Sequence, residues 1–541
     1  MPRGTQVING TEYVFDTDAK WNAEKKYGTH TRTYIGKMVD GIFIPNKRYL
    51  LQCALVEIQN KKAGPVPVTA CSRLFCGTTK LFDEIGEKLG VTNDLKACFP
   101  ESWKQILSIA YFLVMEDRNP LSRFPHWAAH HKHPLGKSIP SQRSSELFGS
   151  IQEDAKQRFF RLQAKRRMET EYLAYDTTSI SSYSTMIKQV RYGKNKDHEQ
   201  LPQINLALLY GESSHLPVYY RKLPGNINDV STVRRLLADL AFLSFDKVKL
   251  VMDRGFYSED NINELFRKHY KFLIATKKSL RLVRSVLDEV RDSMKSRICY
   301  HSDFKLNYYS RTVDWNYTET KKRSGIVATS SRRVYVHLYY NDQKALDDRQ
   351  AFNTLLDTLE SELRSGRRNP DHAKLYHKYY DIAETPVRGI TLTPKQDVID
   401  QIEKDYGYFA LMSNDIKDPI EACILYRCKD LIEKAFGNLK ERLNMRRTSV
   451  SSEENLEGKL FVQFVALIYL SYINKIMSEQ GLYRNYTLNE LLDELDVIEC
   501  FEQPGHSASV GEITKKQKDL YTAFGVAVPS YLDSRIELYA T

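Results

Sequence analysis

The chain has 541 residues, of which 42% are hydrophobic and 27% are charged. This hydrophobic content excludes a wholly disordered chain, and the length is that of several domains. Lysine and arginine number 79 against 68 for aspartate and glutamate, and the resulting net charge of +11 favours a polyanionic partner.

Residues 1–75 are predicted to form a small β-rich module. Apolar and polar residues alternate there, and turn sequences interrupt them, as in Tyr34-Ile35-Gly36-Lys37 followed by Ile44-Pro45. These features indicate strands joined by short turns rather than helices.

Residues 76–168 are predicted to form a helical module. Short helices joined by basic loops are typical of proteins that read DNA grooves, but also of any small helical bundle. One helix is expected to begin near Gln142 and Arg143, which are candidate DNA contacts, and the next with a capping box, Ser150-x-x-Glu153. We interpret the module as the part that binds DNA ends.

Residues 169–280 are predicted to be the first part of an α/β core. The expected strands are Leu173–Tyr175, Ile204–Tyr210, Val218–Lys222, Val248–Met252 and Lys271–Thr276, with helices over Val230–Phe245 and from the N-cap Ser258. The order β-β-β-α-β-α-β is that of an RNase H-like layer whose last helix is missing at this point.

The second half of the chain completes this order after an interruption. Residues 281–405 are predicted to be a β-containing insertion domain, and 406–480 the second part of the core, with a strand at Tyr408–Ser413 and one long helix over Ile420–Leu443. A helical C-terminal region follows at 481–541. The apolar run Leu460–Ile473 is too short to span a bilayer and predicts a buried helix.

Two aspartates follow apolar strands. Asp176 and Asp253 each come at the predicted carboxyl end of a strand, where ligands of α/β sheets collect. A single aspartate in such a place is more often an N-cap or a turn former. Two of them, on separate central strands and with a third carboxylate later in the chain, favour a catalytic site.

The third carboxylate is Glu433. On one continuous helix, Tyr426, Lys429, Glu433 and Lys440 would share a stripe about 60° wide beside the buried face. Gly437 would lie on the same stripe, where close approach of a phosphate backbone would account for a glycine inside a helix. The alternative is a solvated helix stabilised by pairs four residues apart.

Three carboxylates can hold two divalent cations about 3.5–4 Å apart, which promote in-line displacement at phosphorus. Mg²⁺, or Mn²⁺ in its place, suits such a site because it takes oxygen ligands and keeps positions open for substrate. Asp176, Asp253 and Glu433 are therefore the candidate catalytic and metal-binding residues, and Tyr426, Lys429 and Lys440 are candidate phosphate contacts.

With these motifs in order, the chain resembles the DDE transposases of bacterial insertion sequences, in the group of the IS-four superfamily marked by Y-x2-R-x3-E-x6-K. The match is Tyr426-x2-Lys429-x3-Glu433-x6-Lys440, with lysine where the group has arginine. Asp176 in DTTS and Asp253 in MDRGF match the first and second acidic motifs. The resemblance implies an RNase H-like core with an insertion domain before the glutamate.

The resemblance also implies DNA contacts outside the triad. In relatives that make DNA hairpins the insertion supplies an aromatic residue for a flipped base, and Trp315 is the candidate here; an ordinary strand tryptophan is the alternative. Arg254 lies beside the expected site and is a candidate phosphate contact.

The predicted function is that of a cut-and-paste transposase. It would bind the terminal inverted repeats of its element, hydrolyse the DNA ends and join the 3′-hydroxyls to target DNA, as a homodimer on double-stranded DNA. The alternatives are a metal-dependent nuclease without strand transfer and a DNA-binding protein whose triad is idle. Scattered cysteines and the lack of a membrane segment favour a bacterial cytoplasmic, nucleoid-associated protein.

Overall fold

The computed structural model describes residues 3–22, 27–39, 42–51, 71–166, 171–243, 245, 247–320, 327–385, 389–448, 450–502 and 509–529. By its internal contacts the chain divides into two compact units. The first is Met1–Arg73 with Phe501–Ser509 and Leu532–Leu538, and the second is Leu74–Cys500 with Val510–Tyr531 and Tyr539–Thr541.

The first unit contains a four-stranded antiparallel sheet in the order β1-β2-β3-β4. Its strands are β1 (Arg3–Ile8), β2 (Thr11–Asn22), β3 (Tyr27–Val39) and β4 (Ile42–Pro45). Asn9 and Gly10 join β1 to β2 with φ of +48° and +79°, the left-handed conformation that an Asn-Gly hairpin turn requires. The β-rich start is confirmed for the described residues, and the module boundary at residue 75 stays a prediction.

The second unit is built on a mixed ten-stranded sheet. Its strand order is β11-β12-β13-β16-β10-β9-β6-β7-β8, with β17 on β6. The strands are β6 (Leu173–Ser182), β7 (Gln203–Gly211), β8 (Pro217–Pro224), β9 (Lys249–Met252), β10 (Lys271–Thr276), β11 (Tyr300–His301), β12 (Leu306–Thr320), β13 (Val327–Tyr340), β16 (Tyr408–Ser413) and β17 (Arg447–Thr448). Strands β6, β9 and β10 are parallel to one another and lie in the middle of this strand order.

The predicted elements of the core are present. Helices α8 (Asp229–Phe242) and α9 (Glu259–Arg267) follow β8 and β9, and the Ser258 side chain accepts the Asn261 N–H as an N-cap. Strands β10 and β16 have the bounds that the sequence predicts. These elements confirm the mixed α/β class.

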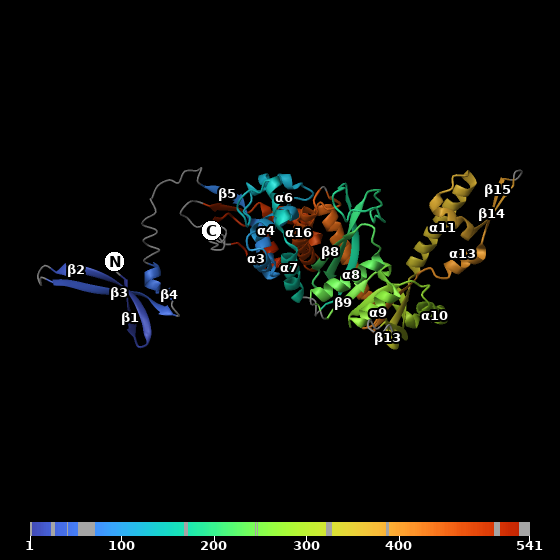
Figure 1. Cartoon of the computed structure of the whole chain (residues 1–541), viewed down its shortest axis with the longest axis horizontal. Coiled ribbons are helices and arrows are strands. Elements are labelled where there is room, and N and C mark those ends of the chain that lie inside the picture. The colour runs from blue at the N-terminus through green and yellow to red at the C-terminus, as the bar shows by residue number, and fades with distance from the viewer. Residues whose placement is uncertain are drawn as a thin grey trace. The chain divides into compact units, whose positions relative to one another are not determined.

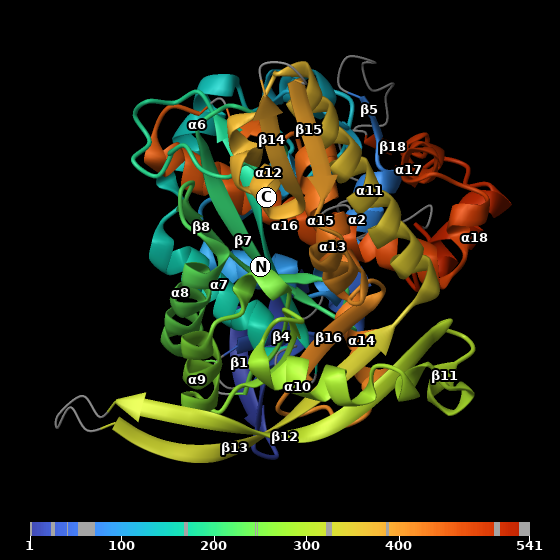
Figure 2. The same cartoon turned by 90° about the vertical axis from the view of Figure 1, so that its right-hand side faces the viewer.

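The segment predicted as an insertion, 281–405, has two parts. After α10 (Arg281–Val290), the long β12–β13 hairpin joins the central sheet, because β13 pairs with β16 (Figure 2). The rest is α11 (Asp342–Ser365), α12 (Ala373–Tyr379), the hairpin β14 (Tyr380–Thr385) with β15 (Gly389–Pro394), and α13 (Gln396–Glu403). This second part has its own core, which includes Phe352, Leu359 and Tyr406.

Helices from both ends of the second unit's sequence pack together around α16 (Glu453–Glu479), as Figure 1 shows. The N-terminal ones are α2 (Gly77–Lys88), α3 (Val91–Cys98), α4 (Trp103–Met115), α5 (Phe124–Ala128), α6 (Ser141–Ser150) and α7 (Glu153–Lys165). Phe159 and Phe160 of α7 make edge contacts with Phe461 and Phe464 of α16. The α16 helix is long and apolar enough to cross a membrane, but it is buried in the protein, as predicted for residues 460–473.

One predicted helix start is wrong. The N-cap of α7 is Gln152, without a side-chain cap, and the hydroxyl of Ser150 donates to the carbonyl of Leu147 at 2.8 Å. Ser150 ends α6 instead of opening α7, because only two residues separate these helices and the serine is still within the last turn of α6.

The C-terminal region predicted as helical also contains short strands. Its elements are α17 (Leu488–Asp496), β18 (Glu499–Glu502), β19 (Ser509–Val510) and α18 (Lys515–Ala523). Capping boxes open both helices, Thr487 with Glu490 and Thr514 with Gln517. Residues 503–508 and 530–541 of the predicted region lie outside the described residues.

A buried charge cluster joins α7, α16 and β8. The ammonium of Lys156 lies 2.8 Å from Glu457 Oε2, and that of Lys222 lies 3.0 Å from Glu457 Oε1 and also bonds Glu453. The two lysine side chains are only 4% and 2% exposed, so neither charge can be solvated by water instead. Burial by itself raises the pKa of Glu457, but the two ammonium groups bring it below its ordinary value.

Glu457→Gln should therefore lower the free energy of unfolding by about 2 kcal/mol, because it removes a shared carboxylate from two buried cations that then keep only Glu153 and Glu453. Urea unfolding at neutral pH would measure the loss, with the exposed Glu454→Gln on the same helix as the matched control. The depressed pKa gives Glu457 a stabilising charge that is present above about pH 4.3 and is lost on further acidification. The difference between wild type and variant should shrink there; a constant difference would contradict this assignment.

Candidate active site

Two acidic residues lie side by side on the central sheet. Strands β6 and β9 pair in parallel from Leu173 and Leu250 as far as Tyr175 and Met252. Asp176 and Asp253 are the next residues on these strands, so the pairing register places them next to each other. The register thus brings together the two aspartates that the sequence predicts at strand ends.

The prediction that Asp176 ends its strand is wrong. Strand β6 continues to Ser182, and Asp176 pairs with Leu208 of the neighbouring β7. The residues that follow Asp176 include Thr177, Thr178 and Ile180, whose β-branched side chains favour a strand. Only β9 stops at the site, where Asp253 begins a short 3₁₀ turn.

The surroundings of the two carboxylates differ. Asp176 accepts the Thr177 N–H at 2.7 Å and lies 3.5 Å from the ammonium of Lys196; burial nevertheless raises the pKa of Asp176. Burial also acts to raise the pKa of Asp253. There, however, the Tyr426 hydroxyl at 2.8 Å and the Arg254 N–H at 2.7 Å donate to Oδ1 and, with the ammonium of Lys429, bring the pKa below its ordinary value.

The helix that carries Glu433 is interrupted, which corrects the prediction of one long helix over Ile420–Leu443. Helix α14 (Pro419–Arg427) ends at Cys428, α15 runs over Lys429–Gly437, and a π-helical turn follows over Asn438–Arg442. At Cys428 the backbone bonds tighten to a spacing of three residues, from Cys428 N–H to Leu425 and from Leu431 N–H to Cys428. The stripe expected for one continuous helix therefore does not hold beyond Cys428.

Three of the four residues on the predicted stripe still meet. Tyr426 donates to Asp253, and the ammonium of Lys429 lies 3.7 Å from Asp253 Oδ2 and 3.4 Å from Glu433 Oε1. The fourth, Lys440, is buried in the π-helical turn, with its ammonium 2.6 Å from Asp197. Lys440 therefore has a carboxylate partner within the protein.

The ammonium of Lys429 lies between two of the candidate acids, Asp253 and Glu433. Burial acts to lower the pKa of Lys429, but the charges of Asp253, Glu433 and Asp176 raise it above the ordinary value. The ammonium thus compensates the negative charge that the three carboxylates bring together.

The donor chemistry of this set suits a divalent cation, since carboxylate oxygens are the ligands that Mg²⁺ and Mn²⁺ take in proteins. Within the described residues, however, no three acidic, histidine or cysteine side chains are already gathered as a ligand set. Glu433 is 54% exposed and bonded to Lys429. A metal at Asp176, Asp253 and Glu433 therefore requires the ammonium to leave and the glutamate to turn inward.

Two residues near the site were missed by sequence analysis. Lys196, from the loop after β6, donates to the Thr177 carbonyl at 2.6 Å and contacts Asp176. Asp229, the first residue of α8, accepts from the Thr177 hydroxyl at 2.8 Å and lies 3.9 Å from Lys196. The only signal for Asp229 was its place after the N-cap Asn228, and Lys196 had none beyond its charge.

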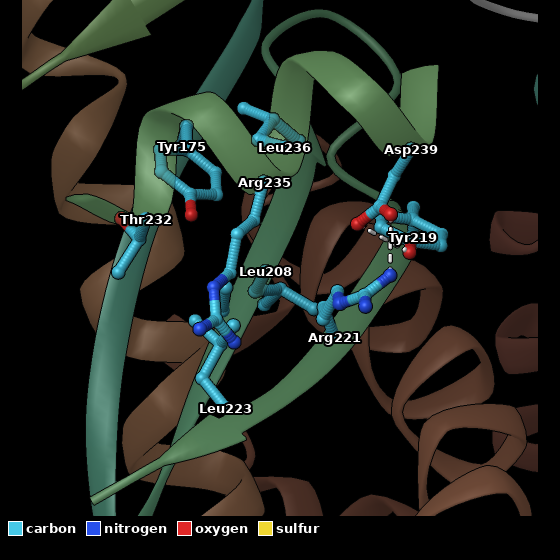
Figure 3. A pocket seen from close by; sticks show the side chains of 10 residues that line it. Tyr175, Leu208, Tyr219, Arg221, Leu223, Thr232, Arg235, Leu236 and Asp239 are labelled. Atoms are coloured by element: carbon cyan, nitrogen blue, oxygen red, sulfur yellow. Dashed lines mark hydrogen bonds and ion pairs between the residues drawn. The ribbon is translucent and has the colours of Figure 1, made fainter. Parts of the chain in front are cut away.

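Helix α8 is held on the sheet by polar contacts between β8 and α8. These contacts border a narrow pocket that Tyr175 also lines. Figure 3 shows Arg221 and Tyr219 of β8 pointing at Asp239 of α8, which both contact, the Tyr219 hydroxyl at 3.0 Å. This clamp fixes the orientation of α8, and with it Asp229 beside Thr177. The pocket itself contains none of the three candidate acids.

Of the other candidate DNA contacts, only Arg254 is the direct neighbour in sequence of a candidate acid. Gln142 and Arg143 are exposed on α6, and Arg254 is exposed directly after Asp253. Trp315 is buried on β12, where its indole N–H donates to Asn263 Oδ1 at 2.8 Å. A role for Trp315 in receiving a base would require it to leave this contact.

Comparison with known proteins identifies one family. The family model described as "Transposase DDE domain" matches residues 168–469, more than half of the chain. No curated protein matches the sequence. Among solved structures, the cryo-EM structure of a piggyBac transposase synaptic complex with hairpin DNA aligns over 84% of this chain and 80% of that one, with a TM-score of 0.33 and 11% identity.

Lys429→Gln should strengthen the binding of Mn²⁺ to the protein without DNA. The variant removes the ammonium that competes for the same carboxylates, and a bound ligand stabilises the folded state by RT ln(1 + c/Kd), where c is the free Mn²⁺ concentration. Thermal unfolding with increasing Mn²⁺ should show a larger upward shift for Lys429→Gln than for wild type. The control is Lys434→Gln, an exposed lysine of the same helix; equal shifts in all three proteins would refute the competition.

Proposed function

The chain belongs to the transposase family with this DDE domain, and from that premise we propose that it is a cut-and-paste transposase of a bacterial insertion sequence. The observation that carries the proposal is that the β6–β9 register places Asp176 beside Asp253, while the ammonium of Lys429 joins Asp253 to Glu433. The Y-x2-K-x3-E-x6-K spacing favours the IS-four group within the family.

The proposed catalytic core is RNase H-like. Its parts are the β6–β10 strands and the α15 helix, which supply the three acids, with 281–405 as the insertion between the second aspartate and the glutamate. The helical module at 76–168, with Gln142 and Arg143, is the proposed binding site for the inverted repeats, and residues 444–541 are the proposed contact surface of a homodimer on DNA.

Asp176, Asp253 and Glu433 would hold two divalent cations, which in such sites activate a water or a 3′-hydroxyl and stabilise the departing oxygen. The chain's own residues orient these acids. Tyr426 and the Arg254 N–H fix Asp253 Oδ1, so the remaining oxygen, Oδ2, faces Lys429 and the site. The Thr177 N–H holds Asp176 in the same way.

Lys429 is proposed to pass from the carboxylates to a DNA phosphate when substrate and metal bind. Its stem is flexible and its ammonium is a compact donor, which suits such an exchange. Gly437 supports an approach of DNA along this helix, because a Cβ built there would meet no described atom within 4 Å. Packing inside the protein therefore gives no reason for a glycine at this position.

The proposal is tested by Asp176→Asn, Asp253→Asn and Glu433→Gln on DNA that carries the element's own ends. Each variant should lose about a thousandfold or more in cleavage, because it removes a ligand of the charge-stabilising metals, and should still bind the ends. The inverted repeats can be read from the DNA that flanks the coding region. Asp430→Asn, an exposed acid of the same helix, is the matched control.

A second assay separates the proposal from its competitors. A transposase joins a pre-cut 3′-hydroxyl end to target DNA, whereas a nuclease without strand transfer releases cut ends only. A protein with an idle triad binds the ends and cuts neither strand. Full cleavage by any of the three variants would place the catalytic site elsewhere.

A further inference from the structure

The loop between β6 and β7 exposes large apolar side chains beside the candidate active site. Tyr183, Met186 and Tyr192 are 64%, 78% and 75% exposed, and all three fall within ten residues of one another. A group of exposed apolar side chains on a soluble surface marks an interaction site more often than a chance arrangement.

The same loop is basic as far as Lys196, after which Asp197 and Glu199 follow. Between residues 183 and 196 there is no acidic residue, and the cations of the stretch are all exposed: Lys188, Arg191, Lys194 and Lys196. Aromatic rings interleaved with cations fit a nucleic-acid strand, since rings stack on bases and cations neutralise phosphates. An acidic peptide would match the charges but would give the exposed tyrosine no stacking partner.

The backbone on both sides of Tyr192 is fixed. Arg191 exchanges two backbone hydrogen bonds of 2.9 Å with Gln203, the first residue of β7. Gly193 packs so closely that a Cβ there would lie 2.1 Å from the carbonyl of Gly225. Tyr192 is therefore an exposed ring on a held backbone, which loses little conformational freedom when a flat group stacks on it.

The loop also reaches the acids. Four residues after Tyr192, the ammonium of Lys196 lies 3.5 Å from Asp176 Oδ1 and donates to the Thr177 carbonyl. Four extended residues span at most about 14 Å, so the Tyr192 backbone lies within that distance of the Lys196 backbone. This is close enough for Tyr192 to meet nucleotides near a phosphate at the catalytic site.

We propose that Tyr192 is a stacking platform for an unpaired DNA base beside the scissile phosphate, and that Lys188 and Lys194 bind the backbone of the same strand. The inference deepens the proposed function, because it names a single, unpaired strand as a substrate of that site. It assigns the exposed apolar surface and the run of cations to one ligand.

Tyr192→Ala should weaken binding of a fluorescein-labelled oligothymidylate about tenfold, since stacking on one aromatic ring contributes on this order. Fluorescence anisotropy in EDTA measures this without metal or cleavage. Tyr192→Phe should bind as wild type because it keeps the ring. Phe242→Ala, which removes another exposed ring at the far end of α8, is the matched control and should also bind as wild type.

The lysines give an independent reading. Lys188→Ala with Lys194→Ala should reduce the slope of log affinity against log salt by about 0.7 for each cation removed, the value for single strands. Circular dichroism checks that every variant is folded.

The outcomes separate this inference from the proposed function. If Tyr192→Ala binds oligothymidylate as wild type does, or if Tyr192→Phe loses as much as Tyr192→Ala, stacking is refuted while cleavage by wild type still supports a transposase. If Tyr192→Ala binds oligothymidylate as wild type does but binds a protein partner more weakly, the surface is a protein interface and the inference is refuted. If wild type neither binds nor cuts any DNA, both proposals fail together.

Discussion

The site depends on the parallel pairing of β6 with β9, which ends at Tyr175 and Met252 and so places Asp176 and Asp253 next to each other. Two carboxylates in partly buried positions repel each other, and a third from α15 adds to the repulsion. The fold supplies two ammonium groups against this charge, Lys196 from the loop after β6 and Lys429 from α15. Much of the surrounding structure serves to hold these groups in place.

The packing around the sheet follows from this requirement. The Arg221–Asp239 contact clamps α8, whose first residue, Asp229, bonds Thr177 and approaches Lys196. On the opposite side of the site, the tightened turn at Cys428 brings Tyr426 and Lys429 to the same carboxylate. Asp253 is thereby held through Oδ1 and faces Lys429 with Oδ2, whereas Oδ1 of Asp176 accepts the Thr177 N–H and also faces Lys196.

Sequence alone predicted the elements whose pattern is local. Lys271–Thr276 and Tyr408–Ser413 are short apolar runs bounded by polar residues, and their bounds were predicted correctly. The break at Cys428 and the continuation of β6 past Asp176 were missed, since no proline or glycine marks the first, and the second depends on pairing with β7. Asp176, Asp253 and Glu433 could be proposed from sequence because their residue types and spacing are visible, whereas Lys196 meets Asp176 only through the loop between β6 and β7.

Lys429 stands where the Y-x2-R-x3-E-x6-K motif, which the sequence resembles, has arginine. A guanidinium is a planar fork that pairs with one carboxylate or phosphate along one edge, whereas an ammonium directs three donors outward from a point. The ammonium of Lys429 lies between Asp253 and Glu433, and the charge of Asp176 also acts to raise its pKa. A fork in the same place would carry the same charge but would direct its donors within one plane. We infer that the lysine binds phosphate without a bidentate fork and holds Asp253 and Glu433 together while the protein is without DNA.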